Sequence, residues 1–333
     1  MLNLLKSLCE LSGVSGNETA VRDFILNEIK GYAEVSVDNK GNIIAFKKGK
    51  KTGRTVMADA HMDEVGIIVT SVTEDGFLTF STVGGIKASA LMCRKVNING
   101  TIGVIGSKPI HLCKGDEAKN LPETDELYID IGAGNKAEAL SAVSLGSVGT
   151  FVTDFTATDG GFFAKAIDDR VGVAVLINLL KQQAEYDFYA VFSCGEEVGS
   201  GAAACAAFGI AAETAVVLEC TTAADIPGVS PEKSVCKVYS GPAVSFMDGG
   251  AVYSKSLYNA AINSGIKCQP KAATTGGNNA ARISTALNGI ECVAISLPCR
   301  YIHSACSFAS VEDIENMELI AKYIINFAAG ENK

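Results

Sequence analysis

Several features that would assign the chain to a broad class are missing from its sequence. No run of about 18 apolar residues occurs, so we expect no membrane-spanning helix. The first residues lack the basic segment and apolar core of a secretory signal, so we expect no signal peptide. Basic residues are also in deficit: 28 Lys and Arg face 37 Asp and Glu, for a net charge of −9. This balance argues against nucleic acid or an anionic membrane as a partner.

Paired cysteines are missing as well. The 11 cysteines are odd in number and scattered, and no two have Cys-x-x-Cys spacing. They are therefore interpreted as small buried apolar side chains rather than as a disulfide framework or a thiolate zinc site. Because thiols persist in reducing compartments, we predict a cytoplasmic protein.

The residues that are present favour a compact α/β protein. A chain of 333 residues is long enough for two domains, and 48% of it is hydrophobic, with 34 glycines suited to tight turns. Residues 15–18 have capping-box spacing, Ser15 with Glu18, and predict a helix over 17–31. Strand-like and helical segments occur up to residue 66, and they alternate again from Phe163, including a predicted strand at 235–238. This alternation indicates a mostly parallel sheet covered by helices.

The segment between these regions has a different residue pattern. From about residue 66 to 157, short β-rich runs alternate with Gly, Asn, Asp and Lys. Such a pattern is typical of a small barrel or sandwich. We predict a catalytic domain made of residues 1–66 and 158–333, with residues 67–157 inserted as a small β-barrel domain.

The most informative motif is the glutamate pair Glu196-Glu197. It follows the apolar run 188–192 and precedes a run of small residues, so it lies at the carboxyl end of a predicted buried strand. Open α/β sheets gather their chemistry at that edge. Two solvated glutamates on a turn would explain the pair in isolation. Two buried carboxylates would instead require a cation or a shared proton.

Other candidate residues occupy similar positions. His61-Met62-Asp63 follows a predicted strand, and period two places His61 and Asp63 on one face. Asp168-Asp169-Arg170 precedes an apolar helix, where simple capping would explain one aspartate but not two. Glu219 and His303 also lie at predicted strand ends. Only three histidines occur, and we interpret the third, His111, as structural.

Together these residues predict a metal site with nitrogen and oxygen ligands and no thiolate. That set suits Zn²⁺, Co²⁺ or Mn²⁺ bound as a pair. Two metals about 3.5–4 Å apart can activate a water for hydrolysis.

The order of these motifs resembles the M42 family of dinuclear metallo-aminopeptidases, which includes glutamyl, deblocking and tetrahedral aminopeptidases. Residues 11–18 resemble the opening motif of the family and residues 60–66 its metal-strand signature. Residues 109–112 and 130–133 resemble segments of its inserted domain. The similarity extends over essentially the whole chain.

The resemblance implies a function and a role for each residue. The enzyme would trim peptides from the N-terminus, in a phosphorylase-like α/β/α sandwich whose barrel mediates assembly of dimers into a tetrahedral dodecamer. His61 and Glu219 would bind one metal, Glu197 and His303 the other, and Asp168 both. Glu196 would be the general base and Asp63 would orient the site, as catalytic residues. The bond between Asp168 and Asp169 would be cis.

Two departures from the family pattern are visible. Glu219 stands where the family often has Asp, and Glu reaches further as a ligand. Asn278-Asn279 replaces a Thr-Asp pair near the substrate, which affects the predicted substrate contacts. Three alternatives stay open. The first two are another amide hydrolase (a dipeptidase, carboxypeptidase or deacylase) and an activity like that of relatives labelled endoglucanases. The third, suggested by the Asn278-Asn279 departure, is a metal-binding subunit without turnover.

Overall fold

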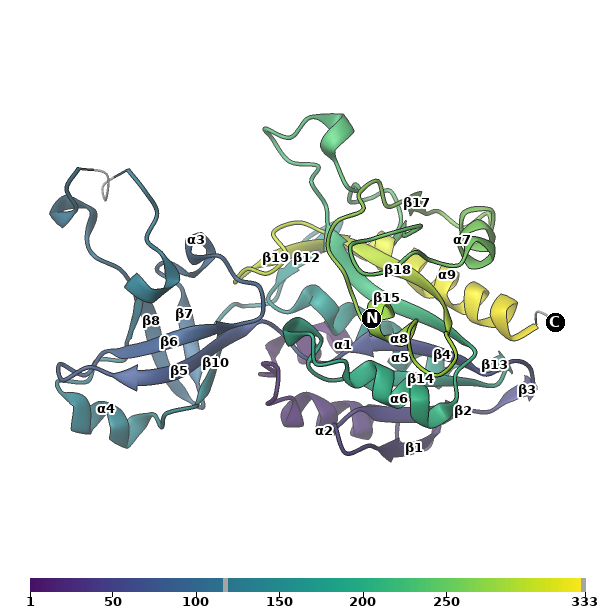
Figure 1. The fold of residues 1–333 in the computed structure, drawn as a ribbon, viewed down its shortest axis with the longest axis horizontal. Coiled ribbons are helices and arrows are strands. Elements are labelled where there is room, and N and C mark those ends of the chain that lie inside the picture. Colours follow the sequence, from purple (N-terminus) through teal and green to yellow (C-terminus); the bar gives the residue numbers. More distant parts are fainter. Residues whose placement is uncertain (116–118, 331–333) are drawn as a thin grey trace.

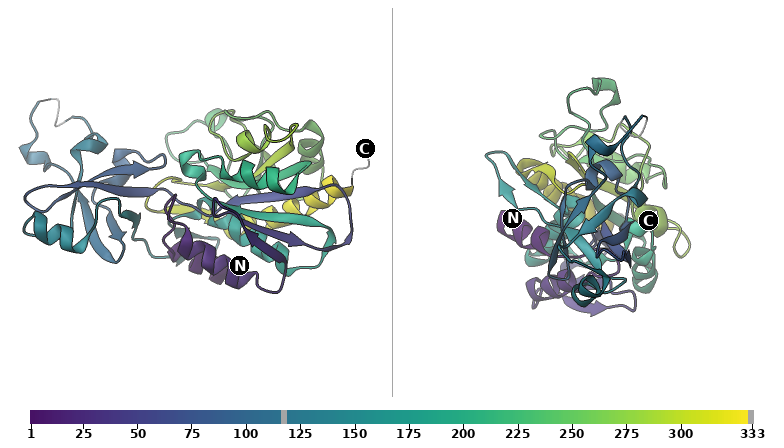
Figure 2. Two further views of the ribbon diagram at one scale, coloured as in Figure 1. Left: turned by 60° about the horizontal axis from the view of Figure 1, so that its bottom comes forward. Right: turned by 90° about the vertical axis from the view of Figure 1, so that its left-hand side faces the viewer.

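The chain folds into an α/β part and a smaller closed β-barrel (Figure 1). This computed structural model describes residues 1–115 and 119–330. Figure 2 shows the barrel projecting from one end of the α/β part, which makes the molecule elongated. The predicted fold class is confirmed; the predicted domain boundaries, after residues 66 and 157, stay predictions. Within the described residues, no helix is both long and apolar enough to cross a bilayer.

An eight-stranded sheet forms the centre of the α/β part. Its order is β1-β2-β14-β4-β15-β18-β16-β17, and the four strands from β14 to β18 are parallel to one another. Their carboxyl ends therefore share one edge. The strands are β1 (Glu34–Val37), β2 (Ile43–Lys47), β4 (Val56–His61), β14 (Phe188–Ser193), β15 (Thr214–Thr222), β16 (Ala243–Val244), β17 (Gln269–Pro270) and β18 (Glu291–Cys299).

Helices cover both faces of this sheet. One face packs against α1 (Leu2–Glu10), α2 (Thr19–Glu28), α5 (Ile167–Lys181), α7 (Lys255–Ile262) and α9 (Val311–Gly330) in the largest apolar cluster. The other face packs against α6 (Ala202–Ile210) and α8 (Ala280–Ile283). The alanines of α6 explain its close packing, because Ala203, Ala206 and Ala207 are buried against the strands. The result is a three-layered α/β/α sandwich.

The barrel closes in the order β10-β5-β6-β9-β8-β7, with β10 pairing β7. Side chains along each strand alternate between the interior and the exterior of the barrel. Along β8, Ile105 is buried, while Ile102 and Val104 face outward. Two short helices, α3 (Ala88–Leu91) and α4 (Lys136–Ala142), accompany the strands. The strands are β5 (Gly66–Val72), β6 (Leu78–Val83), β7 (Lys95–Ile98), β8 (Thr101–Gly106), β9 (Tyr128–Asp130) and β10 (Val148–Phe151).

Two local predictions are wrong. Residues 235–238 do not form a strand: the N–H groups of Lys237 and Val238 donate to the side chains of Gln269 and Asp225, not to a neighbouring strand. Ser15 does not cap α2, because its hydroxyl donates to Asp63. The smaller sheets were not predicted: β11 (Thr156–Ala157), β12 (Gly161–Ala164) and β19 (Ser307–Ser310), and the pair of β3 (Gly49–Lys51) with β13 (Ala184–Tyr186).

Candidate metal centre

The four central parallel strands bring most of the predicted ligands to one edge of the sheet. His61 ends β4, and Glu196 and Glu197 follow β14 in a short 3-10 turn. Glu219 lies within β15, which continues to Thr222, and His303 follows β18. The remaining predicted ligand, Asp168, lies at the start of α5, whereas His111 is exposed in a 3-10 turn (Ile110–Leu112) of the barrel part.

Asp168 lies between the two histidines. Its Oδ1 is 3.3 Å from His61 Nε2, and its Oδ2 is 3.3 Å from His303 Nε2. Each imidazole also faces a second carboxylate: His61 Nε2 is 3.2 Å from Glu219 Oε1, and His303 Nε2 is 3.4 Å from Glu197 Oε2. The arrangement is therefore two imidazole–carboxylate pairs that share one aspartate.

The backbone around Asp168 is irregular. Ala166 has φ 53°, and Asp168 and Asp169 depart from helical geometry although they lie in the first turn of α5. The Asp168-Asp169 peptide bond is cis, which confirms the prediction. Asp169 Oδ1 accepts a hydrogen bond of 2.9 Å from the Gly172 N–H, so Asp169 caps the helix while Asp168 points to the histidines.

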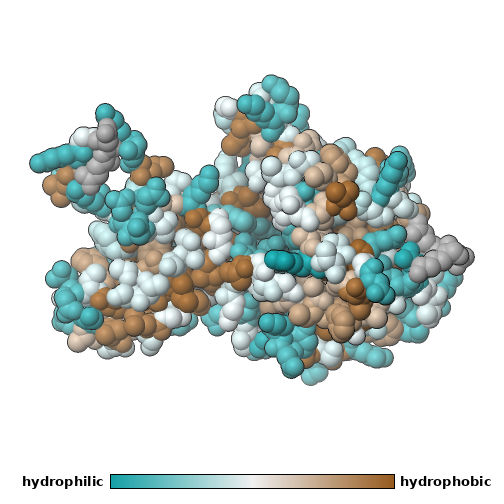
Figure 3. All heavy atoms as spheres, viewed as in Figure 1, coloured by the Kyte–Doolittle hydropathy of each residue, from teal (hydrophilic) through white to brown (hydrophobic). Residues whose placement is uncertain are grey.

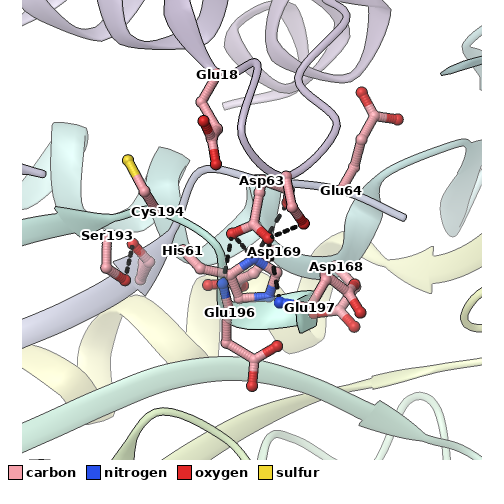
Figure 4. Close-up of polar contacts among 12 residues, drawn as sticks. Glu18, His61, Asp63, Glu64, Asp168, Asp169, Ser193, Cys194, Glu196 and Glu197 are labelled. Atoms are coloured by element: carbon pink, nitrogen blue, oxygen red, sulfur yellow. Dashed lines mark hydrogen bonds and ion pairs between the residues drawn. The ribbon is translucent and has the colours of Figure 1, made fainter. Parts of the chain in front are cut away.

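Asp63 connects His61 to the glutamate pair (Figure 4). His61 Nδ1 lies 3.1 Å from the Asp63 carbonyl oxygen and 3.3 Å from its Oδ1. The Asp63 carboxylate accepts hydrogen bonds from the Glu196 and Glu197 N–H groups and from the Ser15 hydroxyl. Burial opposes ionisation, but His61 and these donors hold the pKa of Asp63 below its usual value. Asp63 therefore orients both the imidazole and the turn.

The donor set fits divalent cations. Five carboxyl groups and two imidazoles converge here: Asp63, Asp168, Glu196, Glu197, Glu219, His61 and His303. Burial raises the pKa of Glu196 to about 7 and that of Glu197 to about 8, with the Asp168 charge adding to both shifts. Cations bound beside Glu196 and Glu197 would lower both pKa values again. The buried Glu197 Oε1 has no hydrogen-bond partner among the described residues, as expected of a free ligand atom.

Oxygen, nitrogen and sulfur ligand atoms within 4.8 Å of one another also form other groups. Asp168, Asp169 and Cys220 form one such set. Burial raises the pKa of the Cys220 thiol well above its usual value, and its Sγ donates to the Ile167 carbonyl, so it is a poor ligand. His61, Asp169 and Glu219 form another set, in which Asp169 Oδ1 caps the helix and Asp169 Oδ2 has no hydrogen-bond partner among the described residues. The distances to both histidines favour Asp168.

A cleft of about 700 Å³ opens from this centre. It lies between the two parts of the molecule: Gly85, Lys87, Ser89 and Ala90 come from the barrel side, and the α/β part contributes Glu219, His303 and the segment around Asn278. Its size is in the range of small-molecule sites. Because Glu219 and His303 both line the cleft, a substrate that enters it reaches both imidazole–carboxylate pairs.

The two asparagines that depart from the family pattern have different positions. Asn278 lines the cleft, and its Nδ2 donates to the Tyr253 hydroxyl at 3.0 Å. Asn279 is buried, and its Nδ2 donates to Asp59 Oδ2 at 2.8 Å and to the Ser193 hydroxyl. An aspartate at position 279 would face the Asp59 carboxylate without a proton to donate. The amide at position 279 thus completes a buried hydrogen bond, away from the cleft.

A buried ion cluster forms around Glu64, whose side chain points away from Asp63 (Figure 4). Both Glu64 oxygens accept from Lys165 Nζ, at 2.9 and 2.8 Å, and Arg170 Nη2 lies 3.3 Å from Oε1. Thr150 of β10 and the Gly13 N–H also donate to this carboxylate. Glu64 therefore connects the N-terminal segment, the barrel and the start of α5. Only the fold brings these residues together, so the sequence analysis did not find them.

Replacing Glu64 with glutamine should destabilise the protein by about 3–5 kcal/mol, since Lys165 and Arg170 would keep buried charges without a counter-ion. Urea unfolding followed by circular dichroism measures the shift. Glu312→Gln is the matched control: it removes the same charge from an exposed ion pair with Lys267 and should leave the midpoint nearly unchanged. Equal midpoints for both variants would contradict a stabilising role for the cluster.

Comparison with known proteins identifies relatives along the whole chain. Residues 41–320 match the model of the M42 glutamyl aminopeptidase family. A protein of Acetivibrio thermocellus whose name describes it as an aminopeptidase is 37% identical, covering 95% of this chain and 96% of its own. The lysyl aminopeptidase of Pyrococcus furiosus is 31% identical, covering 97% and 96%.

Solved structures of peptidases are similar to this chain over nearly its whole length. An aminopeptidase from the archaeon Desulfurococcus kamchatkensis superposes with a TM-score of 0.92 at 31% identity, covering 97% of this chain and 94% of its own. The TET1 peptidase of Pyrococcus horikoshii, which can assemble into a tetrahedron or a large octahedral shell, has a TM-score of 0.85 at 30% identity, covering 97% and 98%. A Thermotoga maritima protein titled endoglucanase has a TM-score of 0.80 at 33% identity, covering 97% and 98%.

Proposed function

The chain belongs to the M42 glutamyl aminopeptidase family of peptidases, and from that premise we propose that it is a metal-dependent aminopeptidase releasing N-terminal residues from peptides. The observation that carries the proposal is the shared aspartate. Asp168 presents one oxygen to His61 and the other to His303. A carboxylate in that position is suited to bridging two cations.

His61 and Glu219 would hold one divalent ion, and Glu197 and His303 the other, with Asp168 common to both. The pair, most suitably Zn²⁺ or Co²⁺ and also Mn²⁺, would supply Lewis acidity and an activated water. The donor set supports borderline metals because it combines imidazole with carboxylate and lacks thiolate. Asp63 keeps His61 oriented through the Nδ1 contacts.

Glu196 is the proposed general base. Among the described residues its carboxylate has no hydrogen-bond or ion-pair partner, although its N–H is fixed by Asp63. In Figure 4 the side chain points away from Asp63. A carboxylate that is free beside the ligands can accept a proton from the attacking water and return one to the leaving amine.

A substrate panel tests the proposal. The purified chain is loaded separately with Zn²⁺, Co²⁺ or Mn²⁺ and assayed on aminoacyl anilides, tripeptides, N-acylated peptides and carboxymethyl-cellulose. Release of the first residue from anilides and tripeptides supports an aminopeptidase. Cleavage confined to dipeptides, C-terminal residues or acyl groups would indicate a dipeptidase, carboxypeptidase or deacylase. Bound metal without any turnover would indicate a non-catalytic subunit.

The relative titled endoglucanase does not favour glycoside hydrolysis here. A pair of carboxylates suffices for that chemistry. It would leave unexplained why both histidines face carboxylates at 3.2–3.4 Å. The cellulose arm of the panel decides this point.

The protein is further proposed to act in the cytoplasm as a homo-oligomer, as dimers that assemble into a tetrahedral dodecamer. The free thiols of the cysteines support a reducing compartment. Assembly is supported by the TET1 relative and by large exposed apolar side chains on the barrel part, which Figure 3 shows there and at its junction with the α/β part. They are Ile102, Val104, Ile110, Leu112, Leu121, Leu140, Leu145 and Val152.

Removing the barrel should abolish this assembly, because such exposed apolar surface is typical of interfaces. Sedimentation of the full chain should show a large particle, and the chain without residues 67–157 should sediment as a much smaller one. Persistence of the large particle in the truncated chain would contradict assembly through the barrel.

A further inference from the structure

Lys271 is the one buried cation that lines the cleft within the described residues. Only 6% of the residue is exposed, yet it borders the same cavity as the candidate ligands Glu219 and His303. Its N–H donates to the Val244 carbonyl just after β17, which holds the residue in the sheet. No hydrogen bond or ion pair of its ammonium group with a described residue is found. Buried lysines are rare unless they are paired.

Among the described residues, no carboxylate forms an ion pair with Lys271. Its titratable neighbour is Cys236, and burial raises the pKa of that thiol to about 12, so the thiol stays neutral. Within the part of the chain that the structure describes, Glu219 is the only carboxylate that lines the cleft, and it is a candidate metal ligand. The remaining polar lining consists of His303, which is also a candidate metal ligand, of neutral groups such as Thr221, Thr275 and Asn278, and of the exposed Lys87. A carboxylate that enters the cleft would therefore gain an ion pair away from bulk water.

We propose that Lys271 selects substrates with an acidic N-terminal residue by pairing with that residue's side-chain carboxylate. The proposal rests on the aminopeptidase function above. The family by itself leaves the choice open, because relatives are named for both glutamyl and lysyl substrates.

The position of the carboxylate in the substrate follows from the reaction. An aminopeptidase holds the first peptide bond at the metals, so the first side chain always lies at about the same distance from Glu219 and His303. The C-terminal carboxylate lies at a distance that changes with peptide length. Lys271 is held by its backbone hydrogen bond to Val244 and lines the cleft of the candidate metal centre. It is therefore suited to bind the first side chain, whose position does not change with peptide length.

Glutamyl and glutaminyl anilides provide the test, because they differ in charge and hardly in shape. With the metal-loaded wild type, kcat/KM for the glutamyl anilide should exceed that for the glutaminyl anilide by roughly 10–100-fold, as expected of one charge-assisted hydrogen bond. Lys271→Met should bring the ratio close to one while leaving glutaminyl turnover within a few-fold of wild type. Lys271→Arg should restore part of the preference. Lys87→Met, the matched control in the same cleft, should keep the wild-type ratio, because an exposed charge is screened by solvent.

Several results would overturn the inference. Equal turnover of both anilides by the wild type refutes it and leaves the aminopeptidase function standing; no turnover of any anilide refutes both. An equal loss on both substrates in Lys271→Met would mean a structural role. Loss of the preference in Lys87→Met would assign it to that lysine. The dipeptides Leu-Ala and Leu-Ala-amide address the other source of a carboxylate: if Lys271→Met changes their ratio instead, the lysine binds the C-terminus.

Discussion

Replacing Glu196 with glutamine should lower kcat by roughly 10²–10⁴-fold, the usual contribution of a general base, while the metal content stays at the wild-type level. The amide has nearly the same shape but cannot accept the proton. The Glu196 carboxylate is not among those that face an imidazole within 3.4 Å. Its replacement should therefore not cause the loss of either metal ion. Steady-state kinetics and metal analysis on the same preparation measure both effects.

Glu197→Gln is the matched control, because it makes the same substitution in the next residue of the same turn. Glu197 Oε2 is 3.4 Å from His303 Nε2, so this variant should lose metal as well as activity. If Glu196→Gln loses metal and Glu197→Gln keeps it, the two roles are reversed. If neither variant changes kcat by more than a few-fold, the turn does not carry the base.

Asp168→Asn should remove both metals together and with them all measurable activity. One aspartate oxygen faces each histidine, so neutralising this carboxylate weakens both sites at once. His61→Ala and His303→Ala remove one imidazole each and should each weaken one site preferentially. Metal counting after dialysis, supported by titration of the apo-variants with Zn²⁺, distinguishes the three.

The comparison among these variants makes the bridging role testable. If Asp168→Asn retains the wild-type metal content, Asp168 does not bridge the two metals. Loss of only one ion, matching either histidine variant, would assign Asp168 to a single site. Circular dichroism on each variant separates loss of metal from loss of fold, because Asp168 lies at the start of α5.

The residue types and their local pattern were enough to predict the main elements and to single out the candidate ligands. The apolar run that became β14 and the alternation in residues 66–157 reflect burial on one or both faces, which is a local property. The strand-end rule singled out His61, Glu197, Glu219 and His303, because parallel strands end at a common edge. Asp168 was singled out instead by the aspartate pair before an apolar helix. Both patterns apply before any coordinates are known.

Contacts between distant residues required the tertiary structure. Ser15 has the spacing of a helix cap, but the fold offers it Asp63, 48 residues away, as a partner. Residues 235–238 have a strand-like pattern, but they meet side chains instead of a strand edge. A local pattern cannot distinguish these cases, because the competing partner is absent from the local sequence.

The sequence by itself thus determined the fold class and which candidate residues gather at the sheet edge, since these depend on the period of burial and on residue type. The tertiary structure alone decided which oxygen of Asp168 faces which histidine and that Glu64 forms ion pairs with Lys165 and Arg170. It also decided that Lys271 borders the cleft without an ion pair to any described residue. The physical reason is that the energy of a buried charge depends on its neighbours in space, and these come from segments far apart in the chain.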